Sequence, residues 1–267
     1  MQRAQARYGQ KPNGVVDNDL IEQLNVPVEG RLAQIAANLE RLRWAPRRVD
    51  PDRIEVNTAS GVVDVYQGGR NTLHMLAAAG KPGDESPILV SRVETVVLNP
   101  TWNVPDNIAE NELRPKGEAY LQRLGFVETS DEGGARLVQR PGPENALGQV
   151  KFLFKNKYSV YLHDTPARAA FGREQRQVSH GCVRLARALD LAQLLLTAQA
   201  GWSPDRLAET LASGETTEVK LPRPVQVMLS YMTAFAQADG RIAFRPDVYG
   251  WDNEVLRQLD AGRPRSA

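Results

Sequence analysis

The stretch YSVYLHDTPARAAFGREQRQVSHGCVRL, residues 158–185, decides how the fold of this chain is interpreted. Its first seven residues alternate Tyr158, Val160 and Leu162 with Ser159, Tyr161 and His163, a pattern typical of a β-strand with one buried face. Its last seven residues contain the only cysteine of the chain and one of its three histidines. A predicted strand therefore leads toward a short segment that carries reactive side chains.

Further strand signals surround this stretch. From residue 53 on, IEVNT, VVDVYQ and LHMLAAAG are separated by Gly, Asn and Ser, which predicts an antiparallel meander. SRVETVVLN and KFLFKN add strands, and VQVMLSYMTAFA is predicted to form a closing hairpin with RIAFR through the Asp239-Gly240 turn. Apolar spacing predicts helices at residues 30–43, 187–200, 203–214 and 253–260. We therefore expect a mainly β fold with α insertions.

The composition changes along the chain predict four regions. Residues 1–27 carry too little apolar surface to fold alone, and residues 28–52 form a helical linker. The main domain covers residues 53–250, and residues 251–267 form a C-terminal helix and tail. Within the main domain, residues 103–146 lose the strand pattern and predict an inserted helical cap, since long ordered insertions tend to cover binding sites. The linker helix is expected to bury Leu32, Ile35, Ala36, Leu39 and Leu42.

The overall charge excludes some classes of partner. Lys and Arg number 33 against 32 Asp and Glu, which leaves a formal net charge of +1 and no bulk attraction to nucleic acid. No apolar run has the length of a membrane span, and one cysteine cannot form an intrachain disulfide. We therefore expect no nucleic-acid partner. We also expect the protein to be a monomer.

Cys182 has three possible roles: a small buried side chain, a metal ligand or a nucleophile. A nucleophilic thiol needs a base or a positive field, and His163, His180 and Arg184 all lie near it in the sequence. Gly181 would let backbone N–H groups point at a developing oxyanion. This density of suitable residue types favours the nucleophile.

The metal alternative uses the same side chains. His180, Cys182 and His163 would supply three ligands of the kind that a catalytic zinc accepts. No second cysteine is present, and Arg184 would place a cation beside Zn²⁺. We therefore expect no metal and no cofactor. His74 lies in a predicted strand far from this segment and is expected to be structural or solvent-facing.

The motifs resemble those of a known enzyme family. His163, fifteen intervening residues and then Ser179-His180-Gly181-Cys182 resemble the signature of L,D-transpeptidases with a YkuD-type catalytic domain. TWNVPDNIA, PGPENALGQVKFLFKNKYSVYLHDTP and SHGCVRL are similar to the larger Gram-negative subfamily, and the resemblance runs from about residue 30 to residue 250. It implies a β-rich domain with mixed, sandwich- or barrel-like sheets and a capping insertion. Residues 4–26 resemble the second half of a peptidoglycan-binding module.

The resemblance also implies a reaction. Cys182 would attack the carbonyl between the L-centre of meso-diaminopimelate and the terminal D-Ala of a stem tetrapeptide, releasing D-Ala and leaving a thioester. The side-chain amine of a second diaminopimelate would resolve the thioester into a 3→3 cross-link. His163 would be the base, with its tautomer held by the adjacent Asp164, by a backbone carbonyl or by Ser179. The active-site turn would comprise Ser179, His180 and Gly181, and substrate would contact Arg184, Tyr161, Trp102 and Asn103.

Hydrolytic alternatives to this reaction would use the same pair, Cys182 and His163. Water in place of the amine would make the protein an L,D-carboxypeptidase or an amidase, and a more remote alternative is a non-catalytic cell-wall-binding module. Expected partners are donor and acceptor stem peptides of peptidoglycan, with a lipoprotein as another candidate acceptor. We expect a periplasmic, cell-wall-associated protein whose signal peptide or membrane anchor is not part of this chain. Arg184 would lower the thiol pKa or bind a substrate carboxylate, and Trp102 would line the cap hinge or fill core space.

Overall fold

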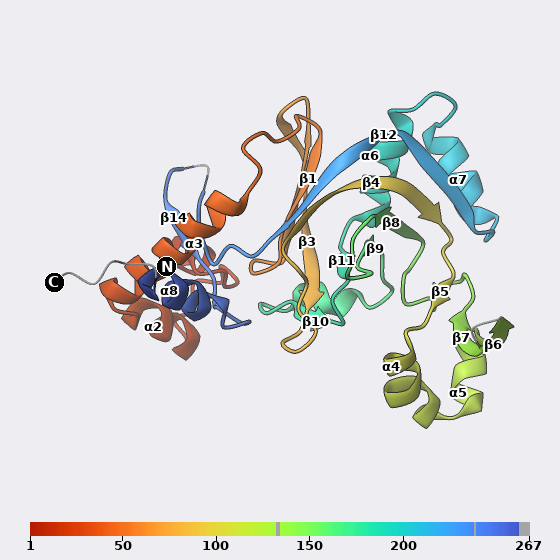
Figure 1. Ribbon diagram of the computed structural model, residues 1–267, viewed down its shortest axis with the longest axis horizontal. Coiled ribbons are helices and arrows are strands. Elements are labelled where there is room, and N and C mark those ends of the chain that lie inside the picture. The colour runs from red at the N-terminus through yellow and green to blue at the C-terminus, as the bar shows by residue number, and fades with distance from the viewer. Residues whose placement is uncertain (132–133, 238, 262–267) are drawn as a thin grey trace.

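One closed sheet forms the centre of the computed structural model, which describes residues 1–131, 134–237 and 239–261 (Figure 1). Its strand order is β10-β3-β11-β9-β8-β4-β12-β1-β2, and the sheet closes because β2 also pairs with β3. Parallel pairs (β1–β12, β3–β10, β9–β11) mix with antiparallel ones, so the predicted mixed, barrel-like β fold is confirmed. The strands are β1 (Arg53–Asn57), β2 (Val62–Gln67), β3 (Arg70–Gly80), β4 (Leu89–Leu98), β8 (Val150–Phe154), β9 (Leu162–His163), β10 (Gln177–Ser179), β11 (Val183–Leu185) and β12 (Thr217–Ser230).

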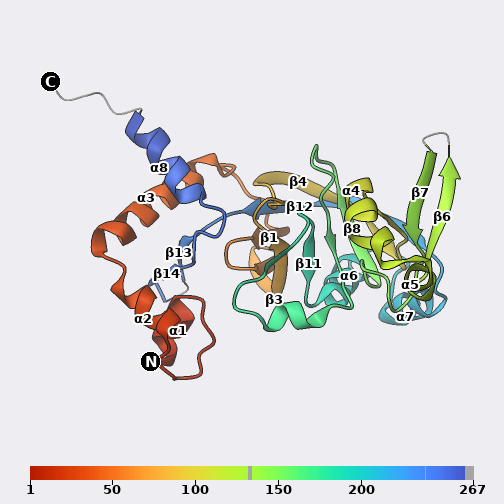
Figure 2. The ribbon, with the colours of Figure 1, turned by 90° about the horizontal axis from the view of Figure 1, so that it is seen from below.

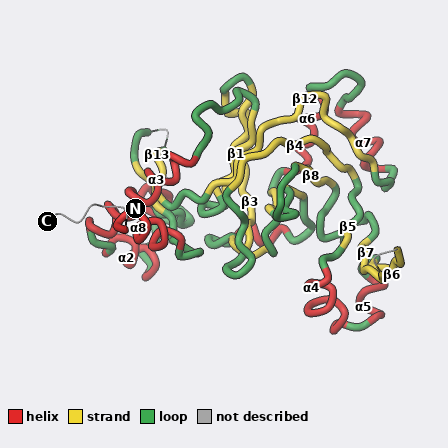
Figure 3. Tube along the Cα trace, viewed as in Figure 1, coloured by secondary structure: helices red, strands yellow, loops and turns green. Residues whose placement is uncertain are grey.

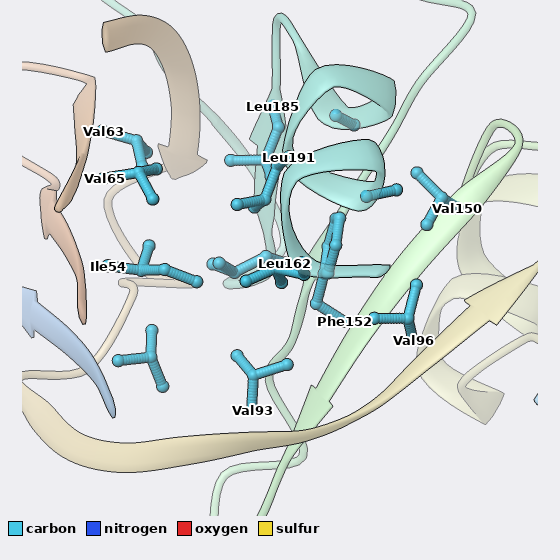
Figure 4. Close-up of a cluster of buried hydrophobic side chains, with 14 of the residues drawn as sticks. Ile54, Val63, Val65, Val93, Val96, Val150, Phe152, Leu162, Leu185 and Leu191 are labelled. Atoms are coloured by element: carbon cyan, nitrogen blue, oxygen red, sulfur yellow. The ribbon is translucent and has the colours of Figure 1, made fainter. Parts of the chain in front are cut away.

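The main core lies inside the curve of this sheet. Helix α6 (Ala188–Thr197) follows β11 almost directly and packs its apolar face against the strands, as Leu191 shows beside Leu185, Leu162 and Phe152 (Figure 4). These four side chains are fully buried, and burial of each contributes about 1.5–3 kcal/mol. Helix α7 (Pro204–Ala212) begins with the Ser203 hydroxyl accepting the Arg206 backbone N–H. The core therefore fixes β9 and β11, the strands next to the predicted reactive segment.

Strand β9 is shorter than predicted. Residues 158–164 were expected to form a strand, but only Leu162–His163 do so. The side chain of Asn156 satisfies the backbone instead, accepting N–H groups from Tyr158 and Val160 and donating to the Val160 carbonyl at 2.8 Å. Ser159 has a φ of +56°, which is incompatible with an extended strand.

The capping insertion contains a strand hairpin that the sequence did not reveal. Besides α4 (Asp106–Ile108), a π-helical turn (Ala109–Leu113), a 3₁₀ turn (Arg114–Lys116) and α5 (Glu118–Arg123), it holds the paired strands β6 (Phe126–Asp131) and β7 (Gly134–Gln139). Strand β7 also pairs with β5 (Trp102–Asn103). The predicted helical cap therefore also contains a β-hairpin, which the loss of the strand pattern over residues 103–146 did not predict. The hairpin is largely exposed and polar, so apolar alternation is weak. The cap lies outside the main sheet around its own small core, which includes Ile108, Leu113, Leu121, Phe126 and Leu137 (Figures 1 and 2).

The two ends of the chain pack together in what we call the terminal lobe, residues 1–50 and 231–261 (Figures 2 and 3). It contains α1 (Gln2–Arg7), α2 (Asn18–Asn25), α3 (Val28–Trp44), α8 (Trp251–Ala261) and the hairpin of β13 (Ala234–Ala236) with β14 (Ile242–Phe244). Contacts of α3 with α8 and β13, and of α1 with β14, hold this lobe together. The predicted hairpin is correspondingly smaller, because residues 225–230 belong to β12. Residues 262–267 of the predicted tail lie outside the described part of the chain.

Helix α3 buries a different face from the one predicted. Leu32, Leu39 and Leu42 are 60%, 58% and 57% exposed. The buried face instead carries Asn38, which donates to the Thr233 hydroxyl at 2.7 Å, and Arg41, which pairs with Asp252. Specific polar bonds between the ends of the chain therefore override the apolar periodicity. None of the described helices is both long and apolar enough to cross a membrane.

The Arg41–Asp252 pair yields a stability prediction. Both side chains are almost fully buried, so Asp252→Asn leaves the guanidinium charge buried without its counter-charge. Loss of one partner of such a pair typically costs about 3–5 kcal/mol. Urea unfolding should show this loss, whereas Glu254→Gln, which removes an exposed pair with Arg257 on the same helix, should change stability by less than about 0.5 kcal/mol. Equal effects of the two substitutions would show that the buried pair does not stabilise the lobe.

Candidate active site

The pairing of β9 with β11 brings the two ends of the 158–185 stretch together. Leu162 lies beside Val183 and His163 beside Arg184 in parallel register. The first pair points into the core, and the alternation of a strand turns the second pair to the opposite face. A cavity of about 280 Å³ covers this face. From the sheet it is lined by Tyr161, His163, Ser179, His180, Cys182 and Arg184, and from the cap by residues that include Trp102, Ile108, Glu112, Leu113, Tyr120 and Phe126.

His163 is held as a neutral base. Its Nδ1 lies 2.5 Å from the Asp164 backbone oxygen, and a carbonyl can only accept, so Nδ1 carries the proton and Nε2 keeps its lone pair. The Asp164 backbone carbonyl is thus the group that sets the tautomer, and a backbone carbonyl is one of the options left open by the sequence. Burial, together with the charges of Arg184 and Lys151, lowers the pKa of His163 to about 3. The imidazole is therefore uncharged near neutral pH.

The Cys182 thiol is also uncharged at rest. Burial raises its pKa, and hydrogen bonding with Tyr161 and the charges of Arg184 and Lys151 only partly offset this effect. The Tyr161 ring also contacts the His163 ring, with centroids 5.7 Å apart. The thiol and the imidazole line one cavity without a direct hydrogen bond between them in the described structure. The thiolate therefore has to form when a base removes the proton, and such catalytic bonds often tighten only with substrate bound.

The turn before β11 leaves the Cys182 amide available in the cavity wall. The Ser179 hydroxyl donates to the Cys182 carbonyl at 2.5 Å and accepts the Gly181 N–H at 3.3 Å. The Val183 N–H donates to the Tyr161 carbonyl. Among the described residues, the Cys182 N–H has no hydrogen-bond partner. Ser179 therefore organises the turn and does not orient His163, and the Cys182 amide is a free donor for an oxyanion.

His180 points toward the cap rather than toward the base. Its Nε2 lies 2.6 Å from Glu112 of the cap and 3.3 Å from the Lys81 ammonium. Glu112 belongs to the π-helical turn of residues 109–113. His180 thus links the active-site turn to the cap, which leaves His163 as the imidazole placed for proton transfer.

The predicted substrate-binding residues separate into two groups. Tyr161, Trp102 and Arg184 line the cavity, and Trp102 also packs edge-on against Phe126 at 6.1 Å. Arg184 forms no ion pair within the described residues, so its charge is available to a carboxylate. Asn103 is exposed and does not line the cavity, so the structure does not bring it to the site.

Two residues near the site were missed by the sequence analysis. Lys151 on β8 lies directly across from His163, so His163 has a cation on each side, Lys151 and Arg184. Burial lowers the pKa of Lys151. Glu112 reaches the turn from the cap. The alternation of KFLF indicates only that Lys151 points away from buried Phe152, and which strand lies beside β8 is set by the tertiary fold.

The structure also bears on His74 and on the metal alternative. The His74 side chain is 63% exposed and lies 2.8 Å from Asp64, so its solvent-facing position is confirmed. In the part of the chain that the structure describes, no three His, Cys, Asp or Glu side chains are arranged to hold a metal ion. The zinc alternative therefore has no ligand set among these residues.

The chain is similar to known proteins over its central region. A sequence profile of the YkuD family, described as the L,D-transpeptidase catalytic domain, matches residues 51–221. The chain belongs to the L,D-transpeptidase family. The matched region of this L,D-transpeptidase-family chain contains the closed sheet except residues 222–230 of β12. It does not contain residues 4–26, whose likeness to a peptidoglycan-binding module stays a prediction.

Individual relatives of this transpeptidase-family chain share between 14% and 33% of their aligned residues with it. A Haemophilus influenzae protein, whose name provisionally describes it as an L,D-transpeptidase, is 33% identical over 241 residues, covering 83% of the chain. The chain spans about half, 48%, of that relative's length. Among solved structures, the L,D-transpeptidase from Mycobacterium smegmatis is 17% identical with a TM-score of 0.35, covering 67% of this chain and 58% of that one. The Enterococcus faecium catalytic domain acylated by ertapenem is 14% identical with a TM-score of 0.32, covering 68% and 98%.

Proposed function

We propose that this protein is a cysteine acyltransferase that forms 3→3 cross-links between peptidoglycan stem peptides. The proposal is carried by one observation: a thiol, a neutral imidazole with a free Nε2 and an unpartnered backbone amide line a single cavity. An acyl transfer needs a nucleophile, a base and an oxyanion donor, and these groups supply them. Membership of the L,D-transpeptidase family supports the assignment.

The first half-reaction is assigned to named atoms. His163 Nε2 takes the thiol proton as Cys182 Sγ attacks the carbonyl between the L-centre of meso-diaminopimelate and the terminal D-Ala. The oxyanion of the tetrahedral intermediate accepts the Cys182 N–H. Collapse expels D-Ala, whose amine receives the proton from His163, and a thioester remains. The free cation of Arg184 would bind a carboxylate of the donor in a bidentate pair.

The second half-reaction distinguishes transfer from hydrolysis. An amine from a second diaminopimelate attacks the thioester, and His163 removes its proton. The cap favours this route, because side chains such as Trp102, Ile108 and Phe126 cover the cavity with apolar surface and limit the access of water. Hydrolysis to a tripeptide, as in an L,D-carboxypeptidase or an amidase, is the competing outcome of the same thioester. Cell-wall location in the periplasm, and a lipoprotein as acceptor, belong to the same proposal.

Incubation with a disaccharide-tetrapeptide tests this function. Mass spectrometry should find a cross-linked dimer that has lost one D-Ala, together with free D-Ala. A tripeptide product without dimer would assign the chain to the hydrolases. Unchanged substrate, with the thiol still reactive, would leave the protein as a wall-binding module and overturn the proposal.

A further inference from the structure

A buried serine outside the SHGCVRL segment holds the active-site turn by a hydrogen bond to its backbone. Ser86, in the loop between β3 and β4, is fully buried. Its hydroxyl donates to the Gly181 carbonyl at 2.7 Å and accepts the Gly80 N–H at 2.9 Å. A Cβ on Gly80 would lie 1.9 Å from the Asp84 carbonyl oxygen, so this loop is packed tightly against the end of β3. The Gly181 carbonyl is therefore bound by a side chain with little freedom to move.

Because the peptide bond is planar, the contact of Ser86 with the Gly181 carbonyl also fixes the direction of the Cys182 N–H. In a trans peptide the C=O and the following N–H point in opposite directions. With the Gly181 carbonyl directed into the protein toward Ser86, the Cys182 N–H is directed the other way. Cys182 lines the active-site cavity, and its amide has no hydrogen-bond partner among the described residues. The Ser86 bond thus sets the direction of the proposed oxyanion donor.

A tyrosine of the terminal lobe supports this serine. The Tyr249 hydroxyl donates to the Gly80 carbonyl at 2.6 Å, and the Tyr249 hydroxyl oxygen accepts the Ser86 backbone N–H at 3.5 Å. The Tyr249 ring is fixed by Tyr231 and Trp251, with centroid distances of 4.7 and 4.8 Å. Burial raises the pKa of Tyr249 to about 12, so the hydroxyl keeps its proton near neutral pH. This tyrosine lies outside residues 51–221, the region that the family profile matches.

We propose that Ser86 and Tyr249 are positioning residues that aim the Cys182 N–H at the oxyanion, so that the terminal lobe controls the rate of acyl transfer. The proposal rests on the acyl-transfer function proposed above. Ser86 acts directly on the peptide plane between Gly181 and Cys182, and Tyr249 acts through Ser86 and Gly80. Neither side chain needs to touch the substrate.

Two reactions of the same thiol separate positioning from general structural damage. Acylation by a carbapenem passes through a tetrahedral oxyanion, whereas alkylation by iodoacetamide is a direct displacement without one. Loss of an oxyanion donor costs about 10²–10³ in rate, so Ser86→Ala, which loosens the donor without removing it, should slow acylation by about tenfold to a hundredfold. Tyr249→Phe, which loses one supporting hydrogen bond, should slow it by about threefold to tenfold. The alkylation rate should stay at the wild-type value in both variants.

Thr233→Val is the matched control. It also removes a fully buried hydroxyl from the terminal lobe, but Thr233 bonds Asn38 and Asp252 and not the loop of residues 80–86. Its ratio of acylation to alkylation rates should equal that of the wild type. If Ser86→Ala does not fold, the ratio for Tyr249→Phe decides alone.

The outcomes keep the two proposals apart. A wild-type protein that is alkylated but never acylated would overturn the acyl-transfer function. A wild type that is acylated, with unchanged ratios in Ser86→Ala and Tyr249→Phe, would overturn the positioning role and leave the acyl-transfer function intact. A ratio lowered equally by Thr233→Val would show that any weakening of the lobe has this effect, and would also overturn the specific role of Tyr249.

Discussion

Cys182→Ala is expected to abolish formation of an acyl-enzyme completely. This is the only cysteine of the chain, so no other thiol can take over the attack. Cys182→Ser should be almost as inactive, because a hydroxyl is far harder to deprotonate than a thiol and the buried His163 is a weak base. Intact-protein mass spectrometry after incubation with a carbapenem, whose strained amide is an activated acyl donor, measures the adduct directly.

The fold should survive this substitution. The Cys182 side chain is only partly buried, and alanine removes a single sulfur atom. Thermal unfolding of Cys182→Ala should therefore resemble that of the wild type, which separates loss of the nucleophile from loss of structure. An adduct of equal yield on Cys182→Ala would mean that another residue is the nucleophile.

His163→Ala is expected to lower the acylation rate by roughly 10²–10⁴, the usual effect of removing a general base. His180→Ala should have a smaller effect, because His180 contacts Glu112 and Lys81 rather than presenting a free nitrogen to the thiol. Acylation rates of the two purified variants, measured against pH, make the comparison. Greater damage in His180→Ala, with a wild-type profile in His163→Ala, would exchange the roles of the two histidines.

The lowered pKa of His163 also predicts the direction of a pH effect. The folded-state pKa is about 3, against 6.5 for an unperturbed histidine, so the unfolded chain binds more protons between these values. The stability contributed by the neutral, buried imidazole is complete above pH 6.5 and is lost as the pH falls toward 3. His163→Ala should therefore weaken the acid dependence of unfolding across this window. An unchanged dependence would show that the imidazole titrates normally in the folded protein.

The sequence predicted the strands with a clear apolar face and failed where polar contacts decide the structure. KFLF and VVDVYQ alternate strongly and form β8 and β2 as expected. The hairpin of β6 and β7 has little apolar alternation because its surface is mostly exposed. Helix α3 shows a regular leucine pattern, yet bonds from Asn38 and Arg41 to the C-terminal segment bury its other face. Local periodicity cannot reveal a partner about 200 residues away.

The candidate site shows the same division. Cys182, His163 and Arg184 were named from residue type and spacing, and the pairing of β9 with β11 brings them to one cavity. Ser86 and Tyr249 carry no motif, and they reach the turn only through the closed sheet and the terminal lobe. Residue types can therefore indicate which groups react, while the groups that orient them emerge only from the tertiary structure.

Trapping the covalent intermediate from a natural class of donor tests the central claim most directly. The wild-type protein is mixed with a disaccharide-tetrapeptide, quenched in acid during turnover and digested with trypsin. We expect the peptide of residues 177–184, which contains Cys182, to carry the donor minus D-Ala as a thioester that hydroxylamine removes. Turnover with this peptide unmodified, or with the acyl group on another peptide, would contradict the account.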